Sequence, residues 1–131
     1  MNIRLATLTL SVAIAVSTPA SSADQRIAGT FDGLIWSNGE KPGATRFEIS
    51  QQGGIVGAYS FGAGETGTLT DCRWDAPDLR CIWNDEYGMG DFIVTFADDF
   101  SGFSGAWYET VNTTGRFVTD SGLAWTGQRR Q

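Results

Sequence analysis

The sequence predicts an all-β protein, a single small antiparallel up-and-down barrel of about eight strands. Short runs of alternating apolar and polar residues follow one another at fairly regular intervals, separated by Gly, Asn and Asp. No segment beyond the first two dozen residues carries a helical period of useful length. A glycine two positions before a large apolar residue recurs, as in Gly29-Thr30-Phe31 and Gly105-Ala106-Trp107. This pattern suits a small barrel, because its interior has no room for a large side chain at every inward position.

The N-terminus has the pattern of an export signal. Met1-Asn2-Ile3-Arg4 supplies a positive start, residues 5–16 form a nearly unbroken apolar run, and small residues lead up to Asp24. The apolar run is shorter than the roughly 20 residues of a membrane-spanning helix. We therefore expect a signal peptide over 1–23, a β-barrel domain over 24–131, and a secreted or periplasmic location.

Eight strands are expected in the domain. They cover residues 26–35, 45–50, 55–61, 65–72, 79–84, 91–97, 100–109 and 122–129. In the second run Phe47 and Ile49 share one face, and Arg46 and Glu48 share the other. Residues 51–54 have the composition of a hairpin turn, and residues 36–44 and 110–120 that of polar loops.

The two cysteines, Cys72 and Cys81, are expected to form a disulfide. They flank the turn sequence Asp75-Ala76-Pro77-Asp78, and export would carry them to an oxidising compartment. Closing so short a loop is worth about 2.5 kcal/mol on the chain-entropy scale. A metal or redox pair is the alternative, but the cysteines lack C-x-x-C spacing and the chain has no histidine.

Charge and composition exclude several classes of function. Nine basic residues stand against fifteen acidic ones, a net charge of −6, which becomes −7 when Arg4 leaves with the signal. This balance opposes binding to nucleic acid and insertion at an anionic membrane surface. Without histidine the chain lacks Ser-His-Asp and Cys-His catalysis and imidazole-ligated metals. We expect a non-enzymatic protein without metal or cofactor; its oligomeric state is left open.

Acidic residues around the expected loop 84–91 offer the remaining catalytic possibility. One hypothesis assigns Asp85, Glu86 and Asp91 to a small carboxylate-dependent hydrolase, and another makes them oxygen ligands of calcium. The simpler interpretation is that turns of an acidic protein collect Asp and Glu.

Aromatic residues are numerous, with five Trp, three Tyr and eight Phe. Trp107 and Trp125 are expected mainly to fill the barrel, whereas Trp36, Trp74 and Trp83 lie nearer strand ends. Rings at a barrel mouth beside Asn and Asp are suited to stacking on a small ligand. The candidate ligand-binding residues are Trp36, Tyr59, Trp83, Tyr87 and Trp107.

A series of short glycine-aromatic elements occurs in order along the middle and end of the chain: Gly57-Ala58-Tyr59, Gly67-Thr68-Leu69, Trp83, Gly90-Asp91-Phe92, Phe103-Ser104-Gly105-Ala106-Trp107 and the closing Trp125-Thr126-Gly127-Gln128-Arg129. In these elements the chain resembles small exported bacterial β-barrel domains of the lipocalin and avidin sort, with calycin-type architecture. The resemblance implies a meandering barrel and brings no established activity. Avidins share the Gly-Thr-aromatic opening, but Phe31 stands where they usually have Trp, and their biotin-binding donors have no clear counterparts here.

Three functions follow as hypotheses. The first is a binding protein for a small apolar or saccharide ligand at one open end of the barrel. The second is a protein-interaction module, such as a periplasmic inhibitor of a protease or lysozyme, whose acidic surface steers it to a basic target. The third is the small hydrolase. A ligand-sized cavity in the barrel favours the first, and a solidly packed interior favours the second.

Overall fold

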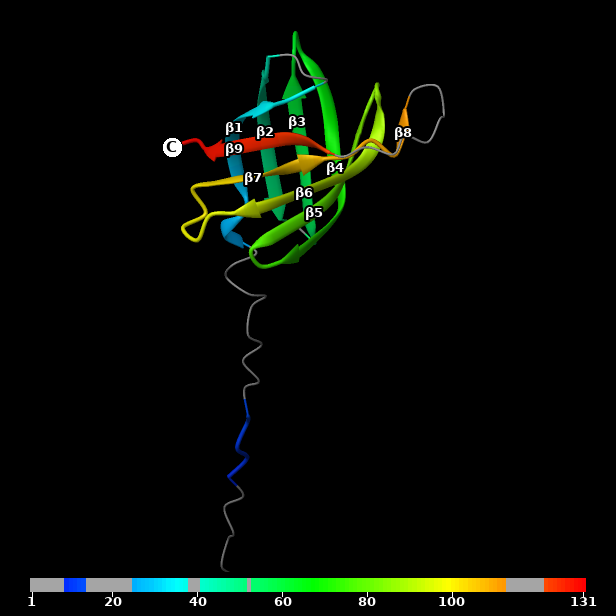
Figure 1. The fold of residues 1–131 in the computed structure, drawn as a ribbon. Coiled ribbons are helices and arrows are strands. Elements are labelled where there is room, and N and C mark those ends of the chain that lie inside the picture. Colours follow the sequence, from blue (N-terminus) through cyan, green and yellow to red (C-terminus); the bar gives the residue numbers. More distant parts are fainter. Residues whose placement is uncertain (1–8, 14–24, 38–40, 52, 113–121) are drawn as a thin grey trace, which may run out of the picture.

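One sheet contains every described strand of the computed structural model (Figure 1). The structure describes residues 9–13, 25–37, 41–51, 53–112 and 122–131. Its strands are β1 (Gly29–Ile35), β2 (Gly43–Gln51), β3 (Ile55–Phe61), β4 (Glu65–Asp75), β5 (Asp78–Asp85), β6 (Gly88–Phe96), β7 (Gly102–Trp107), β8 (Val111–Asn112) and β9 (Leu123–Arg129).

The predicted signal peptide falls outside the described residues except for 9–13, which are exposed and form no regular element. The signal peptide therefore stays a prediction. Among the described residues, no helix has both the length and the apolar character needed to cross a membrane.

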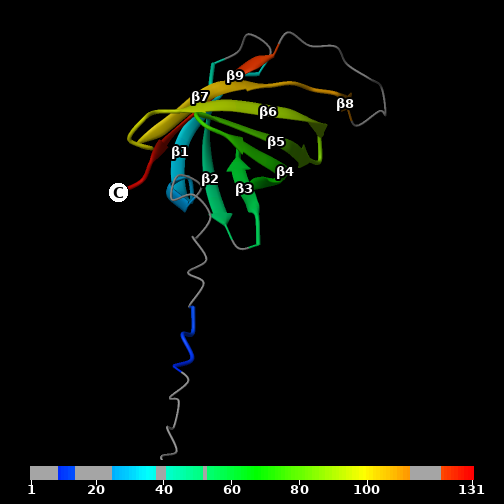
Figure 2. The same cartoon turned by 90° about the horizontal axis from the view of Figure 1, so that it is seen from below.

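The strands close into a barrel in hairpin order. The sheet runs β5-β4-β3-β2-β1-β9-β7-β6-β8, all neighbours are antiparallel, and pairing of β5 with β6 joins its ends. The two-residue β8 pairs with the start of β6, beyond the stretch of β6 that pairs with β7, so β8 continues the line of β7. Eight strands therefore form the wall, and Figure 2 shows them curving around a common interior. The predicted fold class is confirmed, and the closed barrel is consistent with a calycin-like architecture.

Only the predicted strand 55–61 has the observed bounds at both ends; the other strands differ at one or both ends by one to three residues, and β8 lies in the predicted loop 110–120. Two of these differences have a clear structural basis. The first strand begins at Gly29 rather than at residue 26, because Gln25 accepts a hydrogen bond from the amide of Ala28 (3.2 Å) and residues 25–27 turn. The expected loop 84–91 is only a two-residue turn: β5 continues to Asp85, which pairs with Gly88 at the start of β6.

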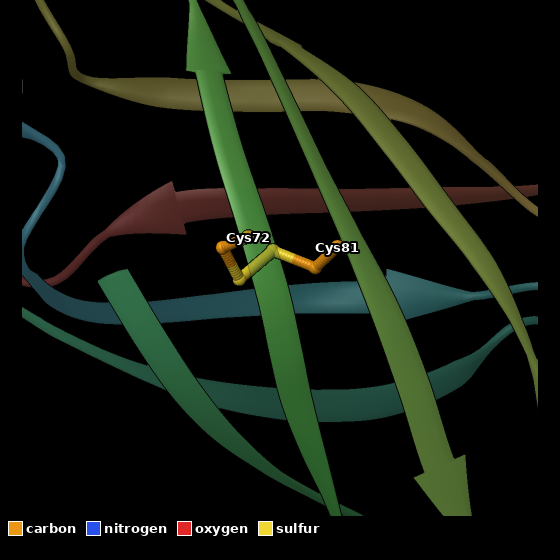
Figure 3. Close-up of a disulfide and its surroundings, with 2 residues drawn as sticks. All are labelled: Cys72 and Cys81. Carbon is orange, nitrogen blue, oxygen red and sulfur yellow. A yellow bond between two sulfur atoms is a disulfide. The ribbon is translucent and has the colours of Figure 1, made fainter. Parts of the chain in front are cut away.

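A bulge in β4 brings the cysteines together, and Figure 3 shows the bond between them. Thr70 pairs with Ile82 and Arg73 with Arg80, so two residues of β4 oppose Cys81 alone. One of them, Asp71, has a positive φ of 50°. The extra residue reverses the alternation of side chains, which turns Cys72 inward. The predicted Cys72–Cys81 disulfide is confirmed, with Cα atoms 4.0 Å apart, and is what an oxidising compartment favours.

Aromatic rings fill the middle of the barrel. Phe47 lies 5.1 Å from Phe103 and 4.9 Å from Trp125 between ring centroids, and all three are buried. Glycines make this packing possible on neighbouring strands. A Cβ on Gly67 would lie 2.2 Å from the ring of Tyr59, its cross-strand partner. In this pair, the glycine of one strand leaves room for an aromatic ring on the neighbouring strand, and the ring packs over the glycine.

Arg129 closes one end of the barrel. Its guanidinium donates hydrogen bonds to the carbonyl oxygens of Phe100 (2.9 Å), Ala28 (2.8 Å) and Arg26. It also lies over the ring of Phe31, 4.6 Å from the centroid. The end of β9 and the β6–β7 loop lie together at this end, and β8 lies at the opposite end (Figures 1 and 2).

Candidate functional site

A cavity of about 410 Å³ occupies the barrel mouth at the end away from Arg129. It lies where β1, β3, β5 and β7 end and where β4 and β9 begin. Its aromatic lining residues are Tyr59, Phe61, Trp83, Tyr87, Trp107 and Trp125, and the others are Ile35, Ser37, Glu65, Asp85 and Glu109. The volume is within the range of small-molecule sites.

Aromatic rings in edge-to-face contact make the floor and one wall. The floor is Trp125, which is 1% exposed and meets Tyr59 edge to face at 5.0 Å. Beneath the floor, Phe47 and Phe92 pack against the same indole. These contacts fill the interior below Trp125 and leave the space above it open.

The wall is a pair of indoles. Trp83 and Trp107 meet edge to face at 5.4 Å, with ring planes 89° apart. Their N–H groups donate to backbone carbonyl oxygens outside the cavity, that of Trp83 to Tyr108 (2.9 Å) and that of Trp107 to Trp36 (3.0 Å). Each indole is therefore held in place by a hydrogen bond as well as by packing.

The tyrosines are held by carboxylates that line the same cavity. Tyr59 donates its hydroxyl to Asp85 Oδ2 (2.7 Å), and Tyr87 donates its hydroxyl to Glu65 Oε1 (2.6 Å). Asp85 also accepts the backbone N–H of Tyr87 through Oδ1 (2.8 Å). Asp85 therefore binds two tyrosines at different depths: Tyr59, which is 3% exposed and packs on the floor, and Tyr87, which is 50% exposed at the outer rim of the cavity.

These contacts keep both phenols protonated. Burial raises the pKa of Tyr59 well above its usual value, and the hydrogen bond to Asp85 and that residue's charge add to the effect. The hydrogen bond to Glu65 is the main cause that raises the pKa of Tyr87 to about 12. Ionisation of either phenol would place two negative charges on adjacent oxygens.

The charges around the cavity have one sign. Glu65, Asp85 and Glu109 contribute carboxylates, and no described Lys or Arg lines the space. The described salt bridges lie elsewhere, with Asp32 on the barrel exterior. Within the described part of the chain, no three acidic or cysteine side chains group closely enough to hold a metal ion.

Four of the five residues predicted to bind a ligand border this cavity: Tyr59, Trp83, Tyr87 and Trp107. The fifth, Trp36, follows the end of β1 and is absent from the lining. Its backbone holds the site instead, because its carbonyl accepts the indole N–H of Trp107 and its amide donates to Ala124 (3.0 Å). Binding of a ligand by these residues stays a prediction.

The acidic residues considered for a hydrolase or calcium site do not face one another. Asp85 lines the cavity, whereas Asp91 is exposed and pairs with Ile82 in mid-strand. Since Phe92 and Val94 are buried, alternation places Asp91 on the outer face of β6. Glu86 is exposed in the turn. The three surround no common loop, because the hairpin is tighter than its sequence suggested.

Sequence reasoning did not assign seven of the lining residues to a ligand site. Trp125 was expected to fill the barrel and Asp85 was considered only for a hydrolase or calcium site; the others are Ile35, Ser37, Phe61, Glu65 and Glu109. The signal that was available is the phase of each strand. Glu65 has the same parity as the inward-facing Gly67 and Leu69 of β4. Glu109 lies beyond the end of β7 and has no such signal.

No known protein family matches this chain, and a search of curated proteins finds no similar sequence.

Proposed function

We propose that the protein is an exported, non-enzymatic binding protein that takes up a small ligand in the mouth of its barrel. The observation that carries this proposal is the cavity of about 410 Å³, lined largely by aromatic rings above a packed interior. Preformed, mostly apolar concavities with a few placed polar groups are the usual form of small-molecule sites. The inhibitor and hydrolase hypotheses have no comparable support and stay predictions from the sequence.

The rings around the cavity are held before any ligand arrives. Trp83, Trp107 and Tyr59 each make a hydrogen bond that fixes the ring in place. A site whose side chains are already ordered loses little conformational entropy on binding. The cavity therefore has both the shape of a binding site and side chains that are already held in place.

Native mass spectrometry of the protein purified from its own periplasm or medium tests the proposal. We expect a retained small molecule, and we expect it to be released by Trp107→Leu. The matched control is Trp74→Leu, because Trp74 is also partly buried but packs on Phe96 and Phe100 at the closed end. A mass that survives Trp107→Leu and is lost in Trp74→Leu would place the ligand elsewhere. A protein mass alone, with no fluorescence response to sugars or lipids, would contradict the proposal.

A further inference from the structure

The cavity is poor in hydrogen-bond donors. Its aromatic lining residues carry five N–H or O–H groups, and each donates to the protein itself. Tyr59 and Tyr87 donate to Asp85 and Glu65, and the indoles of Trp83, Trp107 and Trp125 donate to Tyr108, Trp36 and Thr45. Among the described side chains that line the space, only the Ser37 hydroxyl is left as a donor.

The same cavity is rich in acceptors and in negative potential. The carboxylate of Glu109 makes no hydrogen bond to another described residue, and those of Glu65 and Asp85 keep lone pairs beyond the bonds they accept. The faces of the surrounding rings add to this potential, because an aromatic ring is negative on its faces. No described cation offsets these charges.

We infer that the ligand is an organic cation, an ammonium ion carried on a small apolar or aromatic body; this deepens the proposed function and rests on it. An ammonium group supplies the hydrogen-bond donors and the positive charge that the cavity lacks, and aromatic faces bind such groups by cation–π attraction. A carboxylate ligand would meet three like charges and few donors. A sugar would present hydroxyls that need donors as well as acceptors.

The dimensions set the size of this cation. At roughly 30 Å³ for each water, the 410 Å³ space has the volume of about fourteen water molecules, so the cation has to be a small molecule. The buried floor of Tyr59 and Trp125 suits the apolar body, and the rim carboxylate of Glu109 suits the charged end.

Three probes with one body and different charges test the inference: 2-phenylethylamine, 2-phenylethanol and 3-phenylpropionate, titrated into the full mature protein by calorimetry. We expect the amine to bind at least tenfold more tightly than the alcohol and the propionate to bind most weakly. Glu109→Gln is expected to weaken the amine about three- to tenfold and to leave the alcohol unchanged. The control is Glu48→Gln, which removes the same charge from the exposed face of β2.

The outcomes separate this inference from the proposed function. If the alcohol or the propionate binds as tightly as the amine or more tightly, the inference of a cationic ligand is overturned, and the proposed small-ligand site stands. An equal effect of Glu48→Gln and Glu109→Gln would mean that the preference for the amine comes from the net charge of the protein, and this too would overturn the inference. No binding of any probe at 10 mM, together with no retained mass in native spectrometry, would overturn both.

Discussion

Replacing Arg129 by Met is expected to destabilise the barrel by about 3 kcal/mol. The guanidinium makes three hydrogen bonds to backbone carbonyls and lies over Phe31. Hydrogen bonds to a charged group contribute roughly 1.5–3 kcal/mol each and an exposed cation–π contact roughly 0.5–1 kcal/mol. Arg129 is only partly buried, so water replaces some of what is lost, and the expected net effect is well below the sum.

Urea unfolding followed by tryptophan fluorescence measures this effect. With a slope of roughly 1.5 kcal/mol per molar urea, typical of a small domain, the midpoint falls by about 2 M. Arg130→Met is the matched control, because the Arg130 side chain is half exposed and its one interaction with a described side chain is a 3.4 Å ion pair with Asp32; we expect about 0.5 kcal/mol or less. Arg129→Lys keeps the charge but loses the planar fork, so its midpoint should fall between the two. Equal shifts for Arg129→Met and Arg130→Met would refute the role assigned to Arg129.

Three further perturbations test the packing, the disulfide and the rim. Gly67→Ala should lower the free energy of unfolding by about 1–3 kcal/mol, because its Cβ would lie 2.2 Å from the buried Tyr59 ring. In the control Gly43→Ala the nearest atom is 3.8 Å away, so the free energy of unfolding should change by less than about 0.5 kcal/mol. Similar urea midpoints for the two variants would contradict this. Breaking the Cys72–Cys81 bond by double substitution with Ser should lower the free energy of unfolding by about 2.5 kcal/mol, and an unchanged midpoint would contradict its stabilising role. Because folding raises the pKa of Tyr87 to about 12, the protonated phenol stabilises the fold fully below pH 10, and this stabilisation is lost as the pH rises towards 12. Between pH 9 and 11 the urea midpoint of Tyr87→Phe should therefore decline less than that of the parent. Parallel declines would contradict a stabilising hydrogen bond from the Tyr87 phenol.

Strand number, hairpin order and the disulfide were predictable from the sequence because they depend on local patterns. Alternation in β2 places Phe47 and Ile49 inside, and the observed pairing does the same. The bulge at Asp71 was not predictable, because nothing in the local sequence marks an added residue. That one residue decides which way Cys72 and Trp74 point.

The aromatic part of the candidate site was predictable for a similar reason. Tyr59, Trp83 and Trp107 lie near strand ends, where inward rings border an opening. The acidic part was predictable only in the phase of Glu65, because Glu65 and Glu109 come to line one cavity only when the sheet closes through β5 and β6. The direction of each donor also depends on tertiary contacts, so the charge preference of the cavity required the structure.

The five indole N–H signals of a nitrogen-15 NMR spectrum test the central claim most directly, because the tryptophans sample both ends of the barrel. Titration with 2-phenylethylamine should shift the signals of Trp83 and Trp107 at the mouth and leave that of Trp74 at the closed end unchanged. Shifts confined to Trp74, or none at saturating probe, would contradict a ligand site in the barrel mouth.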